Sequence, residues 1–269
     1  MSRLPGSFFA RNLVERRGLL FQLVRRDFEQ RFVGSAVGWV WGLIHPLVLL
    51  LSYWFVFSVC MKFKLGADEV TQNYPLYLFS GMLPWLLFSD TVQRSTGSLL
   101  DQASLITKTV FPSEIVPVSV FLSSLVNHLM ALTLVVAAVG IWLNHISPTL
   151  IFLPAYMALL GLFAVGIGWI MASLQIYLRD TAQILSVILT FWFWMTPIFI
   201  SEEQFPERFR FLLSGNPLSY MVRAYRELLF TYRLPSPQDL AVTAAFAVCT
   251  FVAGGLFFRH MKRGFADVL

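Results

Sequence analysis

The residues that could carry out chemistry are few in this chain, and their spacing does not suit a catalytic or metal site. The histidines and cysteines are scattered along the sequence: His45, His128, His145, His260, Cys60 and Cys249. Metal sites need such ligands at short, regular spacings, and none occurs. The phosphate-binding pattern GxxxxGK[ST] is also absent. We therefore expect no catalytic residue, metal ion or cofactor here, and any energy for work should enter through another chain.

One acidic residue borders an apolar stretch. Asp90 is followed one helical turn later by Arg94, and residues at i and i+4 are neighbours on a helix. A carboxylate inside a bilayer costs a few kcal/mol, so we interpret the two as a structural pair near one end of a membrane helix. Asn127 and His128 form a small polar patch that we assign to helix contacts. A proton-coupled transporter would need more buried ionisable groups than these.

Composition and uncharged stretches predict the elements that position these residues. Apolar residues make up 57% of the chain and charged residues 13%, whereas soluble domains carry roughly 25% charged residues. About 20 apolar residues cross a bilayer. Uncharged stretches occur at 32–61, 70–89, 115–178 (two helices joined by a turn at 144–148), 181–201 and 240–258. The sequence thus predicts an all-α integral membrane protein with six transmembrane helices.

The distribution of basic residues predicts the orientation. Thirteen Lys and Arg lie in the N-terminal segment, the connections 2–3 and 4–5, and the C-terminal tail, and seven lie on the other side. Basic residues favour the cytoplasmic side, so both termini should be cytoplasmic. The net charge of +5 is then a topology signal, and we expect no nucleic-acid partner.

The N-terminal segment has the pattern of an amphipathic interface helix. Apolar residues recur every four positions from Leu20 to Phe32 and include Phe28, while Arg25 and Arg26 fall on the opposite face. Such a helix lies in the plane of the membrane surface. It could anchor the topology or dock a cytoplasmic partner, and the two roles are compatible.

Two connections carry more apolar residues than simple links need. The cytoplasmic connection 98–112 contains Leu105, Ile106, Val110 and Phe111, which could meet a partner or pack against neighbouring helices. The connection 197–235 contains two short helix-length pieces around a turn at 215–217. It predicts a re-entrant outer hairpin acting as a gate or pore lining, or else an amphipathic cap on the outer surface.

Aromatic residues make up 16% of the chain and gather in predicted spans one, two and five. Trp and Tyr are common at membrane interfaces. In the run 191–194, however, Phe191 and Trp194 share one helix face, which should point at protein or at a channel. Flat aromatic faces suit sugar rings. Gly161, Gly166 and Gly168 lie in an apolar helix and favour close helix packing.

Five segments together resemble the transmembrane subunit of ABC exporters for lipid-linked polysaccharides, the O-antigen, capsule and teichoic-acid permease class. They are GWVWGLIHP at 38–46, GMLPW at 81–85, LITKTVFPSEI at 105–115, and WFWMTPI at 192–198 with NPL at 216–218. The resemblance covers nearly the whole chain.

The resemblance implies a homodimer in the bacterial inner membrane, with two copies of a cytoplasmic ATPase subunit that binds ATP and Mg. It divides the chain into a cytoplasmic segment 1–36 with the interface helix, a transmembrane domain 37–260 and a tail 261–269. The coupling helix at about 102–111 would seat on the ATPase through Gln102, Leu105, Ile106, Lys108, Val110 and Phe111. The outer gate at about 198–235 would include Phe209, Asn216, Pro217 and Tyr220. Aromatic channel walls would be formed by Trp41, Tyr53, Trp54, Phe57, Phe191, Trp192 and Trp194.

The function expected from the resemblance is ATP-driven export of a polyprenyl-pyrophosphate-linked polysaccharide, with O-antigen as the expected polymer. One alternative is export of a small hydrophobic molecule on the same architecture. Another is a membrane-embedded glycosyl- or phospho-transferase, which would need clustered acidic residues at the membrane face. No such cluster stands out in the sequence.

Overall fold

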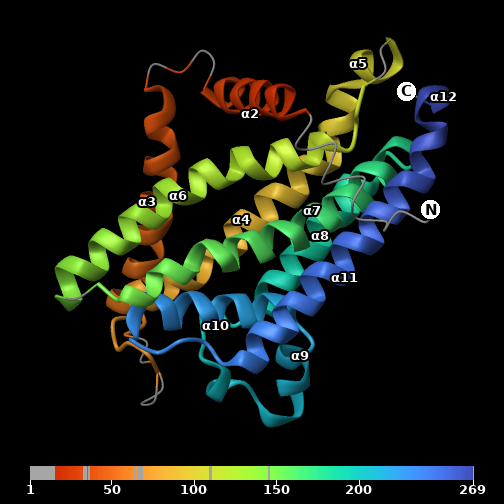
Figure 1. Cartoon of the computed structure of the whole chain (residues 1–269). Coiled ribbons are helices and arrows are strands. Elements are labelled where there is room, and N and C mark those ends of the chain that lie inside the picture. Colours follow the sequence, from red (N-terminus) through yellow and green to blue (C-terminus); the bar gives the residue numbers. More distant parts are fainter. Residues whose placement is uncertain are drawn as a thin grey trace.

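The computed structural model describes residues 16–32, 35, 37–62, 65, 69–108, 111–144 and 146–268. Regular structure in these ranges is helical throughout. The long helices α4 (Tyr74–Asp101), α6 (Ile115–Leu143), α7 (Leu153–Tyr177) and α11 (Pro237–Met261) run diagonally as a bundle, with α8 (Thr181–Trp194) among them and α3 (Trp41–Tyr53) at one side (Figure 1).

The short elements collect at the two ends of this bundle. At one end lie α2 (Arg17–Phe32), α5 (Ala103–Lys108) and α12 (Phe265–Val268) (Figure 1). At the other end lie α9 (Arg210–Ser214) and α10 (Pro217–Phe230), preceded by the 3₁₀ turns η4 (Glu202–Gln204) and η5 (Glu207–Phe209). Helix α6 ends where a turn was expected, at Asn144, whose φ is 55°; Asn tolerates this value better than most residues.

Several helices are long and apolar enough to cross a membrane. In the described part of the chain, four meet both criteria: Trp41–Cys60, Ile115–Leu143, Pro148–Tyr177 and Pro237–Gly264. The first joins α3 to the π-helical η2 (Trp54–Cys60), and the third joins η3 (Pro148–Phe152) to α7. Helix α8 is apolar but shorter, with 14 residues. These helices make the chain a multi-pass membrane protein.

Helix α4 is more polar than these four because it lies inside the bundle. It contacts α6, α7, α8 and α10, so its residues face protein on several sides. Ser80, Thr91 and Thr96 are buried, and their hydroxyls donate to carbonyls of the same helix at 2.7–2.9 Å. Its N-terminus is capped by Asn73, whose side chain accepts from the backbone N–H of Leu76. The uncharged stretch 70–89 therefore forms only the first part of a helix that continues to Asp101.

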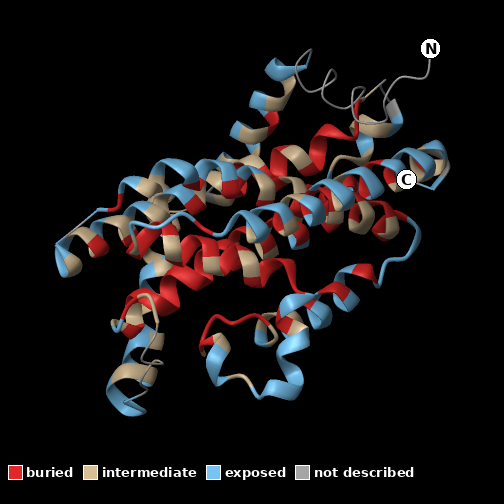
Figure 2. Cartoon of the chain, turned by 60° about the horizontal axis from the view of Figure 1, so that its bottom comes forward, coloured by how far each residue is buried: buried red, intermediate tan, exposed pale blue. Residues whose placement is uncertain are grey.

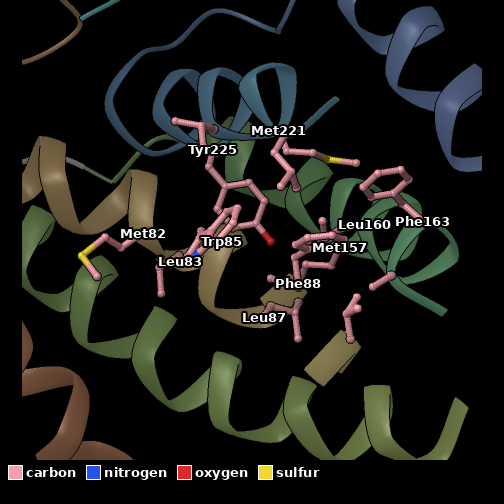
Figure 3. Close-up of a cluster of buried hydrophobic side chains, with 14 of the residues drawn as sticks. Met82, Leu83, Trp85, Leu87, Phe88, Met157, Leu160, Phe163, Met221 and Tyr225 are labelled. Atoms are coloured by element: carbon pink, nitrogen blue, oxygen red, sulfur yellow. The ribbon is translucent and has the colours of Figure 1, made fainter. Parts of the chain in front are cut away.

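The core is built around aromatic side chains of α4, α7 and α10. Phe88 stacks on Phe163 with ring centroids 5.3 Å apart, and Trp85, Leu160 and Tyr225 pack in the same cluster (Figure 3). Buried residues concentrate on the inner faces of the long helices (Figure 2). This core fixes α10 against the bundle.

Three glycines expected to serve close packing do so. A Cβ on Gly166 of α7 would lie 2.5 Å from the carbonyl oxygen of Thr250 on α11, and a Cβ on Gly254 would lie 2.1 Å from the carbonyl oxygen of Gly166. Gly161 faces the ring of Phe121, and Gly168 faces Ser95. Helices α7 and α11 therefore approach backbone to backbone.

The segment Trp41–Cys60, in contrast to α7 and α11, is not closely packed within the chain. All of its residues are described and none is buried, although its mean composition is strongly apolar. Helix α8 also exposes one face, which contains Ile184, Val187, Ile188, Phe191 and Trp194. Both helices present apolar surface outward.

Candidate functional site

Helix α2 is tied to the bundle by a partly buried ionic network. An Arg31 Nη atom donates to Asp90 Oδ2 at 3.0 Å, and Ser124 Oγ donates to the same oxygen at 2.6 Å. Arg94 pairs with Asp27 of α2 and lies 3.7 Å from Asp90. The pair predicted between Asp90 and Arg94 is therefore present, but it is one edge of a network that joins α2, α4 and α6.

This network gives a stability prediction. The variant Asp90→Ala should lower the free energy of unfolding by about 1.5–3 kcal/mol, the usual contribution of hydrogen bonds to charged groups, because Arg31 and Ser124 lose their shared acceptor. The thermal midpoint in detergent and the rate of tryptic cleavage at Arg25 and Arg26 would measure the change. Asp101→Ala, at the exposed end of the same helix, is the control. Equal midpoints for both variants would contradict the role of the network.

The other residues predicted for an interface helix lie on the exposed side of α2 or at its edge. Arg25 and Arg26 are exposed, and Arg25 pairs with Glu29 at 2.7 Å. Phe28 is half-buried, and Leu23 is buried. Phe21 is 68% exposed, so α2 also carries apolar surface away from the bundle.

Helix α5 turns a polar face outward. Ile106 and Phe111 pack against the hydrophobic core of the chain, and Gln102 and Leu105 are half-buried. Ser104 and Thr107 are exposed. Val110 and the side chain of Lys108 lie outside the described residues. Of the two interpretations of the apolar residues in this connection, packing on neighbouring helices holds for Ile106 and Phe111.

The predicted aromatic wall residues fall into two groups. Trp41, Trp54, Phe191 and Trp194 are exposed, by 49%, 42%, 70% and 62% respectively. The others pack within the chain: Tyr53 and Phe57 contact Phe199 at centroid distances of 5.5 and 5.3 Å. The first group is exposed on the surface of a single chain, whereas Tyr53, Phe57 and Trp192 are half-buried.

Trp192 belongs to the half-buried group and links α8 to the start of α10. Its ring meets Phe88 edge-on at 5.2 Å, and its indole Nε1 donates to Asn216 Oδ1 at 2.9 Å. Asn216 also donates to Thr196 Oγ1 at 3.0 Å and caps α10 by accepting from the backbone N–H of Leu218. Asn216 thus joins α8, the following turn and α10.

The hairpin of α9 and α10 combines a largely exposed first piece with a largely buried second piece. Phe209 is exposed, whereas Asn216 and Pro217 are buried at the start of α10. The Tyr220 hydroxyl donates to the carbonyl of Ser214 at 2.9 Å and closes the turn between the pieces. Arg223 then bridges Glu202 and Asp239 at 2.6 and 2.7 Å, which ties the hairpin to α11.

Arg226, a buried arginine on α10, is not among the site residues predicted from the sequence. The Arg226 guanidinium lies 3.5 Å from the centroid of the Tyr77 ring and donates to the carbonyl of Ile198 at 2.9 Å. Gly81 makes room for it, since a Cβ there would lie 2.7 Å from an Arg226 Nη atom. Burial raises the pKa of Glu69, in the loop before α4, and the nearby Arg226 partly offsets that rise. Arg226 and Gly81 are far apart in the sequence, so no local pattern predicts their contact.

The polar patch of Asn127 and His128 in α6 finds a hydrogen-bond partner on α10. His128 is buried, and its Nε2 lies 3.1 Å from the Tyr225 hydroxyl of α10. This agrees with the helix contact predicted for His128. Among the described residues, no group of three or more His, Cys, Asp or Glu could hold a metal ion.

Long apolar helices form a bundle, and ion pairs and hydrogen bonds attach short helices to both of its ends. This arrangement defines a multi-pass membrane protein. More particularly, the chain belongs to the ABC-2 type transporter family, whose model matches residues 18–230. It is 30% identical over 264 residues to an O-antigen export system permease protein of Myxococcus xanthus, covering 96% of this chain and 97% of that one.

Two further relatives agree with this assignment. An O-antigen export system permease protein of Klebsiella pneumoniae is 26% identical, with 93% of this chain and 95% of that one covered. A polysialic acid transport protein of Escherichia coli is 22% identical, with 88% and 91% covered. The chain is thus the permease subunit of an ABC transporter, and membership of this family implies an ATPase subunit as its partner.

Proposed function

We propose that two copies of this chain, with two copies of a cytoplasmic ATPase subunit, export a polyprenyl-pyrophosphate-linked polysaccharide across the bacterial inner membrane, and that the polymer is an O-antigen. The similarity to an O-antigen permease along 96% of the chain carries this proposal. A single chain keeps its aromatic and apolar surface on α3 and α8 outward. That surface is available to line a channel between two copies.

The proposed topology has six spans, formed by α3 with η2, α4, α6, η3 with α7, α8, and α11. Both termini, α2 and α5 are cytoplasmic, which agrees with the excess of Lys and Arg at that end. The hairpin of α9 and α10 then lies at the outer end as a re-entrant gate. On α10, Arg226 is buried, as a charge at membrane depth must be, and Arg223 and Glu227 are half-buried.

In the proposed mechanism, ATP binding closes the ATPase subunits and moves α5. The channel then opens between α3 and α8, where Trp41, Trp54, Phe191 and Trp194 offer flat faces to the C–H surfaces of passing sugars. Repeated weak contacts suit a moving polymer, because a single tight site would hold it in place. The arginines of α2 would attract the pyrophosphate of the lipid carrier.

Transport by purified components tests the proposal. The permease and its ATPase, reconstituted in vesicles, should move a labelled lipid-linked O-antigen only when ATP is hydrolysed. An ATPase variant that lacks its phosphate-binding lysine is the control. A permease that purifies without an ATPase and transports independently of ATP would contradict the proposal. ATP-driven movement of a small hydrophobic dye, with no movement of the glycan, would identify the substrate class as wrong.

A further inference from the structure

The C-terminal segment folds back onto the end of the bundle that carries α5. After α11, the chain makes the 3₁₀ turn η6 (Lys262–Gly264) and the short helix α12, which contacts both α5 and α7 (Figure 1). From the sequence, residues 261–269 are predicted only to form a cytoplasmic tail. The structure places α12 beside the helix that we propose to receive force from the ATPase.

Specific contacts hold this segment in place. Phe265 is 1% exposed and meets the ring of Phe258 edge-on at 5.5 Å. The Tyr177 hydroxyl, at the end of α7, donates to the carbonyl of Met261 at 3.0 Å. Gly264 leaves room for that hydroxyl, since a Cβ there would lie 2.6 Å from it. The C-terminal segment is therefore packed against this end of the bundle.

An ion pair joins this segment to the chain that leaves α5. Lys262 Nζ lies 2.6 Å from Glu114 Oε2, and Glu114 is the N-cap of α6, shortly after α5. The Glu114 side chain is 6% exposed, whereas that of Lys262 is 39% exposed. The backbone carbonyl of Glu114 also accepts from Trp169 Nε1 of α7 at 2.9 Å. Glu114 is thus the point where α6, α7 and the end of α11 meet.

We propose that the C-terminal segment is a strut between the coupling helix and the last span, and that Lys262 is a positioning residue that passes the movement of α5 to α11 through Glu114. The inference rests on the proposed function. A largely buried carboxylate resists separation from its cation, because an unpaired charge in such a place is costly. Movement of the junction between α5 and α6 must therefore carry the end of α11 with it.

The test compares single and double variants in the reconstituted transporter, with export measured per ATP hydrolysed. Lys262→Met should lower this ratio about tenfold, within the usual range of coupling between sites. Lys262→Arg, which keeps the charge, should retain most of it. Arg263→Met, at the exposed neighbouring position, is the matched control and should leave the ratio unchanged.

A double variant separates coupling from folding. Glu114→Gln with Lys262→Met removes both charges, so the thermal midpoint should return to that of the wild type while export per ATP stays low. Wild-type export per ATP in this double variant, or in Lys262→Met alone, would overturn the proposal. A wild-type transporter with no ATP-driven export would instead overturn the proposed function, and with it the role of the strut.

Discussion

Two acidic residues on the exposed end of α5, in the variant Thr107→Glu/Lys108→Glu, should abolish ATP-driven export while leaving the permease folded. Thr107 is exposed, and Lys108 ends the helix. A misplaced charge in a desolvated protein interface costs about 2–5 kcal/mol, which corresponds to at least about thirtyfold weaker binding of the ATPase. Co-purification of the two subunits and export in vesicles would measure both effects.

The choice of these positions follows from the packing of α5. Replacing Ile106 or Phe111 would disturb the core on which both residues pack, so a loss of export there would not separate docking from folding. Lys62→Glu also reverses the charge of a lysine, near the end of η2 and away from α5, and serves as the control. Unchanged co-purification and export in the α5 variant would show that the ATPase binds elsewhere.

Gly254→Ala should prevent stable folding, although the change adds a single methyl group. Its Cβ would lie 2.1 Å from the carbonyl oxygen of Gly166, and both atoms belong to helices whose backbones cannot yield locally. Helices α7 and α11 would have to move apart along their contact. Overpacking usually costs about 1–3 kcal/mol, occasionally more, and a clash with backbone places this variant at or above the upper end.

Gly97→Ala is the matched control for this prediction. Gly97 lies within α4, and a Cβ there would meet nothing within 4 Å. Alanine in a helix interior is favoured over glycine by about 0.5–1 kcal/mol, so this variant should be slightly more stable than the wild type. Thermal midpoints and monodispersity in detergent would compare the two. A midpoint for Gly254→Ala equal to that of the control would contradict the close approach of α7 and α11.

Much of the architecture was open to prediction from the sequence because it depends on local patterns. Uncharged stretches located the apolar helices, and a left-handed Asn144 ends α6 where the turn was expected. The period of four residues identified α2, and the turn at 215–217 separates α9 from α10. Glycines in an apolar helix indicated close packing, and Gly161, Gly166 and Gly168 all face neighbouring helices.

The partners of each helix face were decided by the tertiary structure alone. Trp192 lies inside the chain against Phe88, whereas Phe191 and Trp194 of the same run are exposed. Arg226 is buried over Tyr77. None of these placements leaves a signal along the sequence.

The physical reason lies in the solvent. In water, an apolar face indicates the interior, but lipid chains are as apolar as a protein core. In a membrane protein, apolar residues therefore face lipid, a second subunit or the core with the same local pattern. Local patterns along the chain specify which segments are helical and apolar. Only the packing of distant helices determined that α4 lies in the centre, that α3 lies open, and that Lys262 meets Glu114.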